Sequence, residues 1–181
     1  MHFEGIIKMN PIHVLAFTII HKMRISKQIA RQLSELHFGG NWTGVCFREV
    51  LSGLDWVNAT KSFPQCNSIA RILFHANYFV GVQIRVLKEG ILEGKDALSF
   101  NMPEIRSEVE WISLQDRCWK EVEVLSELIA ELPDEQLLLP FVNEKYGNYY
   151  RNLSGLIEHF HYHLGQMVIL KKQLKEEPLD L

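Results

Sequence analysis

The sequence predicts an all-α protein, and three observations support this prediction. Four long stretches place apolar residues at the three- and four-residue steps of an amphipathic helix. No stretch sustains the alternation of apolar and polar residues that is typical of a half-buried strand. Glycine or proline follows the first three stretches, at Gly39-Gly40, Gly90 and Pro133. Four helices around one core bury such stripes most simply, so we expect residues 1–181 to form a single four-helix-bundle domain, with about ten N-terminal and about seven C-terminal residues peripheral.

The first helix is expected from about Ile12 to Leu36, ending at the two glycines that follow it. A long connection then runs from Asn41 to Pro64, with one short helix expected around Phe47 to Leu51. A connection of this length in a compact domain is usually functional or covers another part of the molecule.

The second helix is expected to begin at an Asn67/Ser68 cap and to run to Lys88 or Glu89, where Gly90 stops it. A loop around residues 94–103 follows. The third helix begins at an S-x-x-E capping box, formed by residues 107 and 110, and runs to the proline at 133. The fourth is expected from near residue 151 to about residue 173.

The fourth helix carries three of the eight histidines, namely His159, His161 and His163. At 100° per residue, His159 and His163 lie on one face, one turn apart, whereas His161 lies about 200° around the helix from each of them. Only His159 and His163 can therefore share a ligand. His161 is expected to face solvent or the opposite flank.

An i, i+4 histidine pair can fill two coordination positions of a transition metal, which then needs a third ligand from another helix. His75 is the best candidate, because its helix is apolar over most of its circumference. The alternative is that His75 is a hydrogen-bonded core histidine and that the pair only lines the rim of the bundle. Taken singly the histidines favour this alternative, and taken together they favour a site. Tyr78 and Gln166, each one turn beyond a histidine of this group, are candidates for supporting or proton-transfer roles, or are simple surface residues.

Composition and charge argue against several functions. Nineteen basic and 22 acidic residues give a net charge of −3, which provides no attraction for phosphate backbones. No segment reaches the ~20 apolar residues needed to cross a bilayer. Cys46, Cys66 and Cys118 lie far apart without a C-x-x-C motif, as expected for reduced thiols. We expect a cytoplasmic protein that binds neither nucleic acid nor membranes. Nucleotide-binding and serine-hydrolase motifs are also absent from the sequence.

Two segments, SIARILFHANYF on the second helix and LSGLIEHFHYHLGQM on the fourth, resemble the DinB-like (DinB/YfiT-like) superfamily of four-helix-bundle metalloenzymes. The N-W-x-G…V-L-x-G-L pattern from Asn41 to Leu54 resembles the linker after the first helix in that family. The resemblance covers nearly the whole chain. It implies an up-down-down-up bundle with a divalent metal bound by three histidines, which correspond here to His75, His159 and His163.

The resemblance leaves the reaction open. Some members of the superfamily are transferases or isomerases that use a low-molecular-weight thiol, and many have no assigned activity. Three protein ligands leave one coordination position for water or substrate, as in catalytic zinc sites. We expect zinc or nickel, and a small-molecule or thiol substrate. The first hypothesis is a metal-dependent transferase or hydrolase; the second is a non-catalytic association or stress-response protein that acts as a homodimer.

Overall fold

The computed structural model describes residues 24–176, and it is all-helical over that range, with no strand beyond two isolated bridges. The predicted all-α class is therefore confirmed. Residues 12–23 of the first predicted helix and residues 177–181 of the predicted peripheral tail lie outside the described residues. No helix in the described range is long and apolar enough to cross a membrane.

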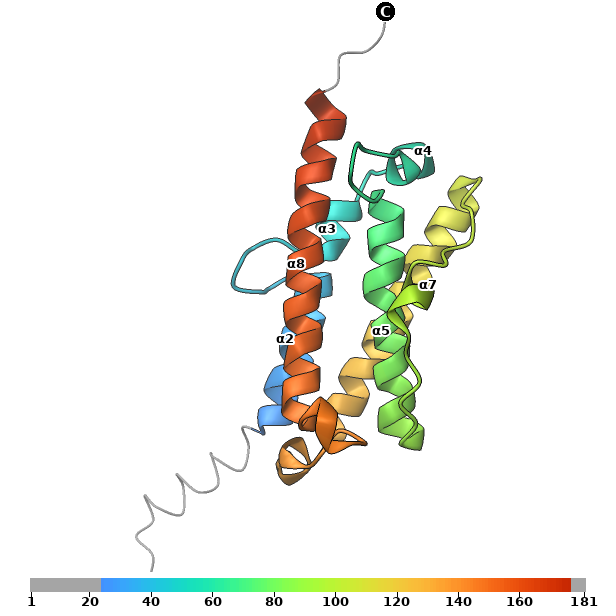
Figure 1. The fold of residues 1–181 in the computed structure, drawn as a ribbon. Helices are drawn as coiled ribbons and strands as arrows, with labels where there is room; N and C mark the ends of the chain where they lie inside the picture. The colour runs from blue at the N-terminus through green and yellow to red at the C-terminus, as the bar shows by residue number, and fades with distance from the viewer. Residues whose placement is uncertain (1–23, 177–181) are drawn as a thin grey trace, which may run out of the picture.

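Within residues 24–176 there are four long helices (Figure 1): α2 (Ile25–Phe38), α5 (Ile69–Glu89), α7 (Glu108–Glu131) and α8 (Tyr149–Glu176). In Figure 1, α2 and α8 run upward and α5 and α7 run downward. Helix α2 packs against α7 and α8, and α5 packs against the same two helices. The apolar faces of all four helices meet in one core, as their periodicity predicts.

Short helices interrupt the connections. The expected one appears as α3 (Phe47–Leu51), but α4 (Trp56–Thr60) and α6 (Asp96–Ser99) were not predicted. Two 3₁₀ turns, Asp134–Leu138 and Glu144–Tyr146, lie between α7 and α8. The long connection after α2 is held against α7 by a buried hydrogen bond, in which Trp111 Nε1 donates to the carbonyl of Leu54 at 2.7 Å.

The predicted ends of α5 are confirmed. Ser68 Oγ accepts a backbone N–H of the first turn, and Gly90 adopts the left-handed conformation at φ 69° and ψ 15°. The capping box of α7 is only half formed. Ser107 Oγ accepts the N–H of Glu110, but the Glu110 carboxylate accepts the N–H of Arg106 instead of that of Ser107. The carboxylate thus reaches one residue further back than a capping box requires.

Helix α8 begins at Tyr149, earlier than the predicted Arg151, and extends past the predicted end at Gln173. Its start is explained by Asn148, whose Oδ1 accepts the backbone N–H of Arg151 at 2.8 Å. Asparagine is a favoured residue for such a cap.

Candidate metal centre

The structure brings together the three histidines that the sequence singles out. His75 comes from α5, whereas His159 and His163 come from α8, which packs against α5. Each ring offers one nitrogen, and these atoms lie within 4.8 Å of one another. The Nε2 atom of His159 is 3.2 Å from Nε2 of His75 and 3.0 Å from Nε2 of His163. The three Nε2 atoms therefore face a common point.

These separations fit a shared metal ion. Zinc binds imidazole nitrogen at about 2.0–2.1 Å, so two such ligands lie about 2.8–3.4 Å apart for octahedral to tetrahedral angles. Both measured Nε2 separations at His159, 3.2 and 3.0 Å, fall within that range. His159 thus lies at a metal-like spacing from both other rings, and all three ligand atoms lie within 4.8 Å of one another.

The hydrogen bond at the far side of His75 fixes its tautomer. Nδ1 of His75 lies 2.7 Å from Ser99 Oγ, and the Ser99 hydroxyl donates to the carbonyl of Asp96 at 2.5 Å. Because that hydroxyl proton is already used, Ser99 Oγ accepts the proton of Nδ1. The lone pair of His75 therefore lies on Nε2, which is the atom that faces the other two rings.

His163 is oriented in the same way. Its Nδ1 donates to Gln166 Oε1 at 2.8 Å, which leaves the lone pair on Nε2. Gln166, a candidate from the sequence, thus lies beside a proposed ligand. His159 differs from both, because its Nδ1 is buried and has no hydrogen-bond partner in the described part of the chain.

Burial keeps the three rings neutral. Burial, together with the neighbouring rings of His163 and His75, lowers the pKa of His159 to about 4. Burial is also the largest cause that lowers the pKa of His75 and of His163. The nearby Asp96 carboxylate opposes the shifts at His75 and His159. At neutral pH the cluster is therefore in the unprotonated form that binds metal ions.

Aromatic rings enclose one side of the cluster. The ring of His75 stacks on Phe100, with centroids 4.1 Å apart and planes 13° apart. Phe79 makes edge contacts with both His75 and His159, at 5.5 and 5.2 Å. A cavity of about 410 Å³ is lined by His159 and Phe79, so a small molecule in it could reach the His159 ring.

Two other residues from the sequence analysis lie elsewhere. His161 is exposed, and its Nδ1 bonds the carbonyl of Ile157 at 3.0 Å, as its position on the helix predicts. The Tyr78 hydroxyl accepts the backbone N–H of Lys95 at 3.0 Å and makes no hydrogen bond to the three histidines. Tyr78 thus holds the segment after α5 in place.

Sequence reasoning missed Ser99 and Asp96, which support His75. Both lie in α6, within a stretch that the sequence predicts to be a loop. No local pattern shows that this stretch returns to the histidines, because its path depends on contacts with α5. The only available signal was the length of the connection between α5 and α7.

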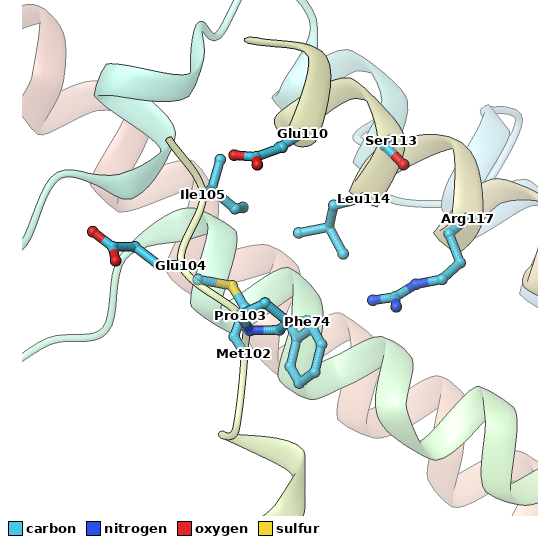
Figure 2. A pocket seen from close by; sticks show the side chains of 9 residues that line it. All are labelled: Phe74, Met102, Pro103, Glu104, Ile105, Glu110, Ser113, Leu114 and Arg117. Carbon is cyan, nitrogen blue, oxygen red and sulfur yellow. The ribbon is translucent and has the colours of Figure 1, made fainter. Parts of the chain in front are cut away.

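A separate cavity of about 200 Å³ lies between α5, α7 and residues 102–105 (Figure 2). Figure 2 shows the Arg117 side chain directed toward Phe74, and its guanidinium lies 5.5 Å from the centre of that ring. None of the three clustered histidines lines this cavity. This cavity therefore serves as a control site for the cavity at His159.

The chain was also compared with known proteins. No family model, curated protein or solved structure was found to match it.

Proposed function

We propose that the protein binds one divalent metal ion through the Nε2 atoms of His75, His159 and His163 and acts as a metal-dependent transferase or hydrolase. One observation carries the proposal: the hydrogen bonds at Ser99 and Gln166 place the lone pairs of two rings on the nitrogens that face the third. The single proton of His159 can be donated to only one of these two lone pairs, whereas a shared metal ion would satisfy both.

The donor set also indicates the metal. Three imidazoles suit zinc or nickel, and a calcium or magnesium site would require oxygen ligands. When bound, such an ion supplies a Lewis acid that makes a water molecule or a substrate thiol more acidic. Asp96 is the one carboxylate among the residues that line the cavity at His159, so it is the group best placed to accept a proton from a ligand there.

We further propose membership of the DinB-like superfamily and a four-helix bundle of up-down-down-up topology. The motifs around His75 and His163 support the first proposal. The opposite directions of the α2/α8 and α5/α7 pairs, with their mutual packing, support the second. The three cysteines, none of which forms a disulfide, favour a reducing cytoplasmic location.

The substrate in this proposal is a small molecule, with a low-molecular-weight thiol as one class. The net charge of −3 argues against nucleic acid as a partner. A homodimer without catalysis is the second candidate. It is favoured by Tyr162 and Ile169, which are 65% and 59% exposed and lie two turns apart on α8, and by Trp42, which is 98% exposed.

The test measures the metal content and the catalytic activity of the same protein samples. Protein freed of metal with a chelator is loaded with zinc or nickel, and the bound metal per chain is measured by elemental analysis. We expect one ion in the wild type and in His161→Ala, and none in His163→Ala. Thiol-transfer and ester-hydrolysis rates should follow the metal content. A wild type that stays metal-free and sediments as a dimer would replace this proposal with the second candidate.

A further inference from the structure

The cavity at His159 follows one side of α8. Arg151, Gly155 and His159 line it at steps of four residues, which places them along one face of the helix. With a rise of 1.5 Å per residue, the Arg151 and His159 backbones lie about 12 Å apart along the helix axis. Gly155 stands between them, and a Cβ atom there would meet nothing within 4 Å. The middle of this wall is therefore open.

The two ends of the cavity carry opposite charges. Asp96 lies at the histidine end, since its carboxylate acts electrostatically on both His75 and His159. Arg151 lies two helical turns away, and its exposed guanidinium forms no ion pair with any residue in the range 24–174. A guanidinium is suited to pair with a carboxylate through two parallel hydrogen bonds.

The α5 wall provides an unused acceptor. Gln83 lines the same cavity and is only 8% exposed, and its Oε1 is buried without a hydrogen-bond partner among the described residues. A buried amide oxygen without a donor is costly, and a ligand N–H would satisfy it once the Gln83 side chain turns its Oε1 toward the cavity. Phe79, one turn before Gln83 and in contact with His159, adds an apolar surface.

We infer that this cavity binds a small carboxylic acid with an amide N–H, such as an N-acylated amino acid. Its carboxylate pairs with Arg151, its N–H donates to Gln83 Oε1, and its apolar acyl end points toward His159. The inference that this acid is a substrate rests on the proposed function. The carboxylate lies at the end of the cavity far from the metal centre, and the acyl end lies near it. The cavity itself does not depend on the metal.

The experiment uses hippurate as the probe and hippuramide, its uncharged amide, as the control ligand. Binding is measured by calorimetry for the full chain, with zinc and after zinc removal. We expect hippurate to bind both forms and to bind more tightly than hippuramide. Arg151→Gln should weaken hippurate about tenfold, which is the effect of one charge-assisted pair, and leave hippuramide and zinc affinity unchanged. Gly155→Leu, which fills the open wall, should abolish binding of both ligands and leave zinc affinity unchanged.

Arg117→Gln is the matched control, because Arg117 is an exposed arginine that lines the separate cavity of Figure 2. The inference would be overturned if hippurate does not bind, if the two ligands bind equally well, or if Arg117→Gln weakens hippurate binding and Arg151→Gln does not. Hippurate binding that requires zinc and is unchanged by Arg151→Gln also overturns the inference, but it supports the metal site. The reverse result, hippurate bound through Arg151 by a protein that takes up no zinc, supports the cavity and contradicts the proposed function.

Discussion

Two histidine environments in this protein share a pKa that burial lowers, and they differ in what their nitrogens face. His37 is 1% exposed, and its pKa is lowered to about 4, mainly by burial, as is that of His159. The His37 ring stacks on Phe47 with centroids 4.9 Å apart, meets the Phe160 edge at 4.4 Å, and bonds the Leu33 carbonyl. In the cluster, by contrast, each Nε2 faces other Nε2 atoms.

The comparison shows that burial and a low pKa do not by themselves identify a metal ligand. His37 satisfies one nitrogen with a backbone carbonyl and packs its faces against aromatic rings, which is a core role. His75 and His163 use their Nδ1 atoms in the same way, through Ser99 and Gln166, but direct the second nitrogen at a common point. The convergence of the remaining lone pairs is the feature that indicates a site.

The largest expected effect is on zinc affinity, and it should separate the cluster from His37. His159→Ala should weaken zinc binding by more than about 100-fold, since loss of a supporting partner alone costs up to that factor. His37→Phe, which keeps an aromatic ring between Phe47 and Phe160, should leave the zinc dissociation constant unchanged. Both constants are measured by competition with a chelating dye. Equal losses in the two variants would mean that burial, and not convergence, governs metal binding.

The second effect is the acid sensitivity of His37. Its pKa is about 4 when folded and about 6.5 when unfolded, so only the unfolded chain takes up this proton between those values. Its contribution to stability is therefore complete above pH 6.5 and is lost as the pH falls toward 4. Between pH 7.5 and 5, the free energy of unfolding of the metal-free wild type should fall by about 2 kcal/mol more than that of His37→Phe. Urea unfolding at both pH values measures this; a difference between the two proteins that is constant with pH would contradict it.

A smaller effect tests the support of the cluster. Ser99→Ala removes the acceptor for His75 Nδ1 and should weaken zinc binding about tenfold, the lower end of the range for such partners. Ser126→Ala is the matched control, because the Ser126 hydroxyl is buried but has no partner in the described residues. It should leave zinc binding unchanged and the fold intact. If both variants bind zinc as the wild type does, Ser99 does not orient His75.

Much of the fold was predictable, because helical periodicity and end signals are local properties of the chain. Ser68 and Gly90 mark the ends of α5 in the sequence as they do in the structure. The short helices α4 and α6 were missed, since so few residues carry no usable periodicity. Helix α8 starts two residues before its predicted start because Asn148 caps it, and the apolar periodicity does not indicate that cap.

The candidate site was predictable in part. Angular spacing on one helix groups His159 with His163 and excludes His161, and Gln166 follows from the same spacing. Spacing cannot show that Nε2 of His75 lies 3.2 Å from Nε2 of His159, because that distance depends on packing between helices that are distant in the sequence. Ser99, Gln83 and Asp96 were missed for the same reason.

The most direct test of the convergence is long-range proton–nitrogen NMR of the histidine rings, with and without one equivalent of zinc. In the metal-free protein, His75 and His163 should show protonated Nδ1 and unprotonated Nε2 atoms. Zinc should shift the Nε2 signals of His75, His159 and His163 together, with a single stoichiometric end point, and leave the His37 and His161 signals in place. Protonated Nε2 atoms at His75 and His163, or zinc-induced shifts at His37 or His161 in place of the three, would contradict the account.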